Sequence, residues 1–278
     1  RSDEGDVFAM HAICPHRGYP LALKGQVIGR ELQCAYHGFA FDGSTGACVR
    51  APSQPRPPAG YRQPVYEVRE RGPWVWIWTG DPERADEADI PSNGELGFGP
   101  GWKYLEASRF TGIKARYMLL LENLFDLTHL GYLHGDMGDF EAIVEAPLEI
   151  EEAENRIRVV RPLRTGWTRH HADVFGEHHK FDGLSDYASI TTYYGPGYIT
   201  TTDYITRSID GRETVDKTVY GDLYFHHAVT PETARSCHYF GTSSRTHRLN
   251  DTAFDAAFAP FDAAVRQQDV DATEAIEA

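Results

Sequence analysis

Two short motifs, C-P-H and C-A-Y-H, lie seventeen residues apart and limit most strongly what this chain can fold into. They supply four potential metal ligands: Cys14, His16, Cys34 and His37. Zinc fingers place like ligands close together, Cys with Cys and His with His, whereas each motif here offers one of each. A [2Fe–2S] centre with two Cys on one iron and two His on the other can take one ligand of each kind from two similar loops. The spacing therefore predicts such a cluster, with a structural zinc site or unrelated Cys and His residues as the alternatives.

A glycine follows each motif, Gly18 in the first case and Gly38 in the second. Glycine permits a tight backbone with positive φ, so main-chain N–H groups can approach the cluster sulfurs. With these glycines, the stretch from Cys14 to His37 resembles the Rieske motif of the Rieske non-haem iron oxygenases. The resemblance implies an all-β Rieske domain at the start of the chain.

Length and charge bound the remaining possibilities. The chain has 278 residues, which suggests one large or two ordinary domains. Its net charge of −14 argues against nucleic acid or an anionic membrane surface as a partner. No apolar run approaches the roughly 20 residues that a membrane-spanning helix needs. Four Cys are too few for a disulfide scaffold, and thiolate cluster ligands fit a reducing compartment, so we expect a cytoplasmic protein.

The first part of the chain has the pattern of short strands. Strands are expected at 7–9, 27–32, 39–41, 66–69 and 74–78. The last of these, rich in Trp, is expected to be buried on both faces or to belong to a small barrel. An acidic stretch from 81 to 101 without clear periodicity predicts the domain boundary, giving a Rieske domain at 1–90 and a catalytic domain at 91–278. Residues 3–6 have the pattern of a hairpin turn, so further N-terminal strands are expected to precede the chain.

The second part changes its periodicity. Apolar residues at helical spacing predict a helix over 113–134, and an Ala-rich charged segment predicts a closing helix over 252–278. Thr- and Tyr-rich stretches at 156–160, 189–194, 199–205 and 218–229 predict a curved antiparallel sheet. The fold class is therefore α+β, an all-β domain followed by a sheet with flanking helices of the helix-grip type.

A second metal motif lies in the predicted helix 113–134. Asn123, Asp126 and His129 are three residues apart and would share one helix face. His134 follows His129 by five residues and would lie roughly 140° away from it on a straight helix. We therefore expect the helix to bulge or break between them, with Gly131 permitting the change.

Two imidazoles and one carboxylate form the facial triad of non-haem Fe(II) oxygenases, which leaves coordination positions open for O₂. The carboxylate must come from elsewhere in the chain. The closing helix offers Asp269, our first choice, and Asp271 as the reserve, although either could be a solvated acid on the helix surface.

The pattern N-x-x-D-x-x-H-x4-H resembles the mononuclear iron motif of Rieske oxygenase α subunits, in the vanillate O-demethylase and dicamba monooxygenase branch. The resemblance implies that Asp269 is the third iron ligand beside His129 and His134. It implies a catalytic role for Asn123 and Asp126, in which Asp126 links His129 to a cluster histidine of a neighbouring subunit. That arrangement requires a head-to-tail ring, expected to be a homotrimer. A local role of Asp126 in orienting His129 is the alternative.

The same resemblance implies the function. The chain would be the terminal oxygenase of a multicomponent monooxygenase, with a [2Fe–2S] cluster and Fe(II), that takes electrons from NAD(P)H through a reductase or ferredoxin. Its substrate would be a small aromatic, a methoxy-aromatic acid that undergoes O-demethylation, with His227 contacting it. Ring hydroxylation or N-demethylation by the same iron, and a Rieske electron-transfer protein without oxygen chemistry, are the alternatives.

Two further groups of residues have open interpretations. Arg161 and Arg164 could hold a substrate carboxylate, although a surface position is the simpler interpretation. The histidines at 170, 171, 178 and 179 lie in a polar stretch that we expect to be a loop, possibly a lid, and not a third metal site.

Overall fold

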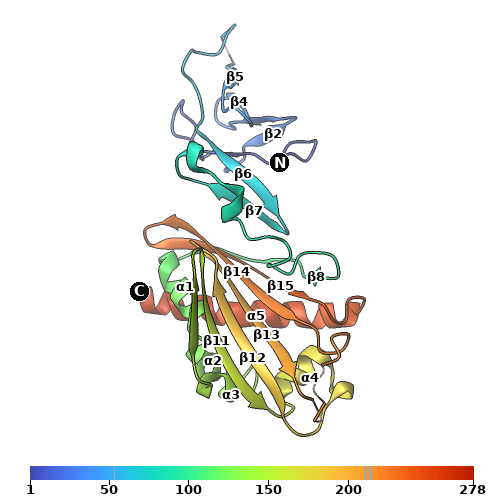
Figure 1. Ribbon diagram of the computed structural model, residues 1–278. Helices are drawn as coiled ribbons and strands as arrows, with labels where there is room; N and C mark the ends of the chain where they lie inside the picture. The colour runs from blue at the N-terminus through green and yellow to red at the C-terminus, as the bar shows by residue number, and fades with distance from the viewer. Residues whose placement is uncertain (53, 210, 213–214) are drawn as a thin grey trace. The chain divides into compact units, whose positions relative to one another are not determined.

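The computed structural model describes residues 1–52, 54–209, 211–212 and 215–278. The chain divides into two compact units, Arg1–Ile90 and Pro91–Ala278 (Figure 1). Among the described residues, no helix is both long enough and apolar enough to cross a membrane.

The first unit is built from short antiparallel strands, as the sequence predicts for a Rieske domain. One sheet has the strand order β2-β3-β4-β5 and the other has the order β1-β6-β7. Two 3₁₀ turns, η1 (Pro82–Arg84) and η2 (Glu87–Asp89), complete the unit. The strands are β1 (Ala9–Met10), β2 (Gln26–Ile28), β3 (Glu31–Gln33), β4 (Ala40–Asp42), β5 (Cys48–Arg50), β6 (Val65–Arg71) and β7 (Trp74–Trp78).

Strand β7 is not buried on both faces, so that expectation is wrong. Val75 is 42% exposed and Ile77 is 51% exposed, while the three Trp side chains are partly buried. The reason is the position of β7 at the edge of a three-stranded sheet, where alternate side chains point to opposite faces.

The second unit contains one curved antiparallel sheet, which confirms the expected fold class (Figure 1). The strand order is β10-β11-β12-β13-β14-β15-β8, and β9 also pairs with β15. The register pairs Ile199 with His227 and Asp203 with Leu223, which fixes the residues that share a face of the sheet. The strands are β8 (Lys103–Tyr104), β9 (Ser108–Ile113), β10 (Glu149–Ala153), β11 (Arg156–Thr165), β12 (Ser185–Tyr193), β13 (Tyr198–Arg207), β14 (Leu223–Thr233) and β15 (Ser236–Arg245).

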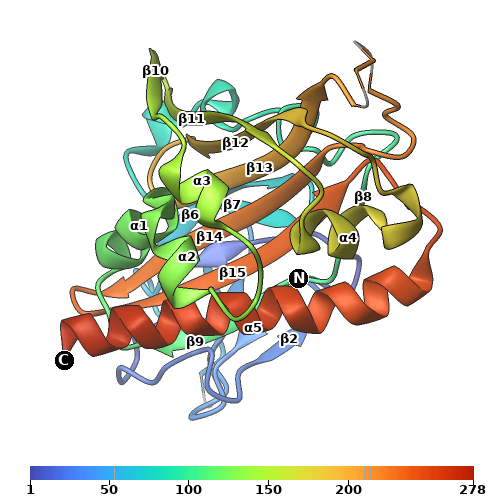
Figure 2. The same ribbon diagram turned by 90° about the horizontal axis from the view of Figure 1, so that it is seen from below.

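The helices of this unit lie on one face of the sheet, and the long helix α5 runs across it (Figure 2). Asp251 caps the start of α5, because its carboxylate accepts a hydrogen bond from the Phe254 N–H at 2.9 Å. The helical segments are α1 (Tyr117–Phe125), η3 (Leu127–His129), α2 (Leu130–Leu133), α3 (Glu141–Glu145), α4 (Arg169–Phe175), η4 (Glu177–His179) and α5 (Thr252–Glu277).

The single helix expected over 113–134 is instead three helical segments preceded by a strand end. Helix α1 ends at Phe125, and the break lies at Asp126 rather than at Gly131, which is inside α2. Asp126 has extended backbone angles, and its carboxylate accepts hydrogen bonds from the N–H of Thr128 at 3.0 Å and its hydroxyl at 2.8 Å. An Asp that caps the next turn in this way competes with continuation of the helix.

The histidine-rich stretch near 170 is helical, so the loop expected there is wrong. It forms α4 and η4, and Thr168 and His171 form a capping box at the start of α4. The imidazole of His171 takes the position that Glu or Gln usually has in this box, which sequence patterns do not anticipate.

The apolar face of α1 positions the metal motif. Leu120, Leu121 and Leu124 are buried in a cluster that includes Ile199 of β13 and Val270 of α5. Helix α1 is therefore held between the sheet and α5, and truncating one of these leucines to Ala should cost about 2–5 kcal/mol.

A buried ion pair ties α5 to the sheet. Arg266 is 1% exposed, and its Nε and Nη2 donate to the two oxygens of Asp262 at 2.8 and 3.0 Å. The remaining N–H groups donate to the carbonyl of His226, the hydroxyl of Tyr239 and the carbonyl of Thr242. All the donors of this guanidinium are thus used within the protein.

Candidate metal centres

The two Cys–His loops of the first unit have the same hydrogen-bond pattern. The N–H of Cys14 donates to the carbonyl of Tyr19 at 2.9 Å, and that of Gly18 donates to the carbonyl of Cys14 at 3.0 Å. In the second loop, Cys34 donates to Phe39 at 2.8 Å and Gly38 donates to Cys34 at 3.0 Å. Gly18 and Gly38 have φ of 69° and 72°, so both turns use the left-handed conformation that glycine allows.

These loops bring the four cluster candidates together. Cys14 is 2% exposed and Cys34 is 1% exposed, and the rings of His16 and His37 have centroids 4.6 Å apart. Burial, with the neighbouring Cys34, raises the pKa of the Cys14 thiol. The buried Nδ1 of His16 has no hydrogen-bond partner in the described part of the chain. Two buried thiols beside an unpartnered imidazole nitrogen fit a [2Fe–2S] cluster with mixed ligands.

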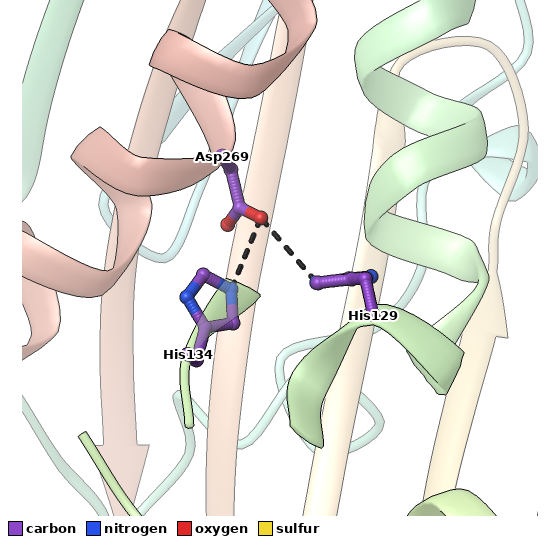
Figure 3. A group of neighbouring side chains, drawn as sticks. All are labelled: His129, His134 and Asp269. Atoms are coloured by element: carbon purple, nitrogen blue, oxygen red, sulfur yellow. Dashed lines mark hydrogen bonds and ion pairs between the residues drawn. The ribbon is translucent and has the colours of Figure 1, made fainter. Parts of the chain in front are cut away.

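The second centre is formed by three side chains from two distant parts of the chain (Figure 3). His129 ends η3, His134 follows α2, and Asp269 lies on α5. Oδ1 of Asp269 is 3.4 Å from Nε2 of His129 and 3.2 Å from Nε2 of His134. One potential ligand atom from each residue lies within 4.8 Å of the others.

Hydrogen bonds on the far side of each ligand set its orientation. Nδ1 of His129 donates to the carbonyl of Asp126 at 2.6 Å, and Nδ1 of His134 donates to Oε1 of Gln268 at 2.7 Å. Because each ring donates from Nδ1, its neutral form keeps the Nε2 lone pair free for a metal ion beside Asp269, and its doubly protonated form donates from Nε2 to Asp269 instead. Nδ2 of Asn123 donates to Oδ1 of Asp269 at 2.7 Å.

The charge of Asp269 is stabilised by its neighbours. Its side chain is buried, and burial alone would raise the pKa of the carboxyl. Hydrogen bonds with His129 and His134 reverse that effect and hold the pKa of Asp269 below its usual range.

This donor set fits a divalent metal ion. Metal–nitrogen and metal–oxygen bonds of about 2.1 Å, at roughly right angles, place neighbouring ligand atoms about 3 Å apart, close to the separations between Asp269 and the two imidazoles. Two imidazoles and one carboxylate on one side of an ion leave the other side open, as in non-haem iron oxygenases.

The other candidates of the sequence analysis have different surroundings. Asp271 is exposed on α5 and accepts a hydrogen bond from Nε2 of Gln267 at 2.7 Å, away from the two histidines. Asp126 is exposed, and it does not share a helix face with Asn123 because α1 has already ended. The structure brings Asn123 to Asp269 and the backbone of Asp126 to His129, while the catalytic roles of these residues stay predictions.

A cavity that opens to solvent lies beside the triad, and its empty space together with the solvent at its mouth is about 690 Å³. Its wall is largely apolar, and His227 is part of it. Nδ1 of His227 is 2.6 Å from the hydroxyl of Tyr239 and 3.0 Å from Nη1 of Arg266. Because Nη1 can only donate, this position favours an unprotonated Nδ1 that accepts from the Tyr239 hydroxyl, which leaves the ring proton on Nε2. Burial, with Arg266 beside it, holds the pKa of His227 well below its usual value. The residues that line the cavity are Leu124, Leu127, His129, Leu130, His134, Phe140, His170, Thr201, Asp203, Phe225, His227, Phe261, Asp262, Val265, Arg266 and Asp269.

The two arginines considered for a substrate carboxylate do not line this cavity. Arg161 is buried, contrary to the surface position expected for it, and its Nη1 donates to the carbonyl of Ala146 at 3.5 Å. The Arg164 side chain is 62% exposed and pairs with Asp186 at 3.0 Å.

Sequence reasoning missed four residues that shape the site. Gln268 orients His134, and Asp203 and the Arg266–Asp262 pair reach the cavity wall. Gln268 directly precedes Asp269 and could have been suspected from that position. Nothing in the local pattern marks Asp203, because its environment depends on strand pairing.

Comparisons with known proteins agree with this geometry. Residues 1–67 match the Rieske [2Fe-2S] domain, and residues 113–278 match the vanillate O-demethylase oxygenase C-terminal domain. The oxygenase component of dicamba O-demethylase from Stenotrophomonas maltophilia is 31% identical over 284 residues, which cover 100% of this chain and 79% of that protein.

Solved structures of related oxygenases are also similar to this chain. The crystal structure of dicamba monooxygenase bound to dicamba has a TM-score of 0.83 at 29% identity, covering 100% of this chain and 78% of that one. The structure of the same enzyme with non-haem iron and dicamba has a TM-score of 0.76 at 28% identity, covering 100% and 77%.

Proposed function

Because the chain belongs to the Rieske non-haem iron oxygenases whose C-terminal domain is of the vanillate O-demethylase type, we propose that it removes a methyl group from the oxygen of a small methoxy-aromatic compound. The chain is the oxygenase component of a Rieske monooxygenase system. The observation that carries the proposal is the buried His129–His134–Asp269 group beside a largely apolar cavity.

We assign the [2Fe–2S] cluster to Cys14, His16, Cys34 and His37, and the mononuclear iron to His129, His134 and Asp269. The chemistry of each set of ligand atoms fits the metal group assigned to it. When bound, the cluster supplies single electrons and the mononuclear iron supplies the activation of O₂. The overall reaction consumes the methoxy-arene, one O₂, two electrons and two protons, and it yields the phenol, formaldehyde and water.

The protein's own residues prepare the site for this reaction. Gln268 and the backbone of Asp126 hold the two imidazoles in one tautomer, and Asn123 holds the carboxylate. Apolar side chains on the cavity wall exclude water from an aromatic ring. Nε2–H of His227 is a neutral donor that can hold an oxygen of the substrate.

Electrons would come from NAD(P)H through a reductase or ferredoxin. None of the four Cys forms a disulfide bond, which fits a reducing cytoplasm. The product assay tests the function directly. The purified holoenzyme with a ferredoxin and reductase, NADH and O₂ should release formaldehyde from a methoxy-arene, and the Asp269→Asn variant should not. Consumption of NADH and O₂ without formaldehyde for every methoxy-arene tested would refute O-demethylation.

We further propose that Asp126 carries the coupling between subunits of a homotrimer. One carboxylate oxygen, Oδ1, caps Thr128, while Oδ2 makes no hydrogen bond to the described residues and the side chain is exposed. Oδ2 is therefore free to accept an N–H from a cluster histidine of a neighbouring subunit, while the carbonyl of the same residue holds His129.

The Asp126→Asn variant tests this role, because Asn also caps helical turns and the local fold is preserved. Light scattering should give the mass of a trimer. In stopped-flow, the variant should reduce its cluster normally and reoxidise it slowly with O₂ and substrate present, while the exposed-acid control Glu122→Gln reoxidises at the wild-type rate. Near-normal reoxidation in Asp126→Asn, or an active monomer, would remove Asp126 from the electron path.

A further inference from the structure

One carboxylate on the cavity wall is not part of the metal site and has an unsatisfied oxygen. Asp203 lies on β13, is 8% exposed and lines the cavity. Its Oδ1 is buried and has no hydrogen-bond partner among the residues that the structure describes. Buried carboxylate oxygens almost always accept hydrogen bonds, because an unsatisfied one costs about 1–3 kcal/mol or more. The hydroxyl of Ser189, which pairs with Asp203 across β12 and β13, is also buried without a hydrogen-bond partner among the described residues. The polar groups around Oδ1 thus leave room for a donor from a bound ligand.

The nearest basic group does not fill this need. Nε2 of His170, from α4, is 3.8 Å from Oδ2 of Asp203, which is too long for a hydrogen bond. Burial raises the pKa of Asp203, and His170 and the hydroxyl of Ser189 act in the opposite direction. A hydroxyl or ammonium group placed against Oδ1 would offset the cost of burying the carboxylate.

Among the described residues, the cavity wall offers no free Lys or Arg for an anionic ligand. Arg266 is the only one of these on the wall, and its donors are taken by Asp262, main-chain carbonyls and the Tyr239 hydroxyl. Arg161 is buried elsewhere and does not line the cavity. A substrate carboxylate near Asp203 would meet like charge, with only the imidazole of His170 close by to offset it.

The strand register places Asp203 away from the metal. His227, which faces the triad end of the cavity, is paired with Ile199, and Asp203 lies four residues farther along β13. At about 3.3 Å per residue, this separation is roughly 13 Å along the strand. Thr201 and Phe225, which pair with each other, line the cavity between these two positions.

We propose that Asp203 determines specificity by accepting a hydrogen bond from a hydroxyl or amine at the end of the substrate remote from its methoxy group, and that it discriminates against a carboxylate there. The proposal rests on the proposed O-demethylation. It changes the expected substrate from a methoxy-aromatic acid to a methoxy-aromatic alcohol, phenol or amine without a carboxylate. His227 and Asp203 would then recognise an acceptor and a donor at opposite ends of one aromatic molecule.

Two nearly isosteric probes test this preference: 4-methoxybenzyl alcohol, which carries a donor, and 4-methoxybenzoate, which carries a carboxylate. Binding to the oxidised holoenzyme is measured by titration calorimetry without reductant, so no turnover occurs. The wild type should bind the alcohol at least about tenfold more tightly, as expected for a hydrogen bond to a charged acceptor. In Asp203→Asn the ratio should fall to within about threefold, mainly because the benzoate binds more tightly.

The matched control is Asp186→Asn, on the neighbouring strand β12, whose carboxylate pairs with Arg164 and Arg207 and does not line the cavity. It should keep the wild-type ratio. Equal or tighter binding of the benzoate by the wild type would overturn the proposal without requiring any variant to fold. An unchanged ratio in a folded Asp203→Asn, or binding of neither probe by the wild type, would do so too. Absence of formaldehyde from every methoxy-arene refutes the proposed reaction instead, because the binding ratio is measured without turnover.

Discussion

Replacing Gln268 with Leu should weaken iron binding without touching an iron ligand. Oε1 of Gln268 accepts the Nδ1–H of His134 at 2.7 Å, and His134 is only 1% exposed. Leu would leave that buried N–H unsatisfied and would allow the ring to take the other tautomer. Loss of such a partner typically lowers metal affinity about 10–100-fold, or about 1.4–2.7 kcal/mol. The cost of one unsatisfied buried donor, about 1–3 kcal/mol, agrees with this range.

The assay is competition for Fe(II) with a coloured chelator, using the cluster absorbance of each preparation as an internal standard. Gln268→Glu keeps an acceptor at the same position and should bind iron within about threefold of the wild type. Gln267→Leu is the matched control, because Gln267 is the exposed neighbour on α5 and bonds only to Asp271. Wild-type affinity in Gln268→Leu, or an equal loss in Gln267→Leu, would refute the reasoning.

Three other changes test separate parts of the structure. Cys34→Ser should bleach the protein and abolish the EPR signal of the reduced cluster, and a retained signal would exclude Cys34 as a ligand. Arg266→Met should lower the free energy of unfolding in urea by about 3–5 kcal/mol, because it leaves the buried Asp262 without its partner; a loss below about 1 kcal/mol would contradict this. Hydrogen bonds from Ser44 and Thr45 lower the pKa of Asp42 from 3.8 to about 2. The ionised carboxylate therefore stabilises the folded state above pH 4, and this contribution is lost as the pH falls toward 2. Asp42→Asn should therefore be less stable by up to about 1 kcal/mol at neutral pH and equal to the wild type near pH 2, and a constant difference across this range would be inconsistent with that origin.

The cluster loops could be predicted from the sequence because their chemistry is local. Each loop places one Cys and one His within four residues, and a glycine with positive φ closes each turn. The closing helix was predictable because it is rich in Ala and charged residues, although Pro260 lies inside it.

The interruption of the helical stretch was not predictable from periodicity. Apolar spacing continues through Asp126, but the side chain of that residue caps the following turn and ends α1. Whether an Asp within a helical pattern points to solvent or caps a new turn depends on tertiary packing.

The choice between Asp269 and Asp271 and the position of Asp203 depend on long-range pairing. Gln268 and Asp269 contact His134, which is more than 130 residues earlier in the chain. Asp203 reaches the cavity only because β13 pairs with β14 in one register, and a shift of one residue would turn its side chain to the other face of the sheet.

The most direct test of the central assignment is the iron content of three proteins, measured with the EPR signal of the reduced cluster in the same samples. The wild type and Asp271→Asn should each contain about three irons per chain, two in the cluster and one at the triad. Asp269→Asn should contain about two irons per chain with an unchanged cluster signal, because the metal at His129 and His134 has lost its carboxylate. Full iron content in Asp269→Asn, or loss of the third iron in Asp271→Asn, would contradict the assignment.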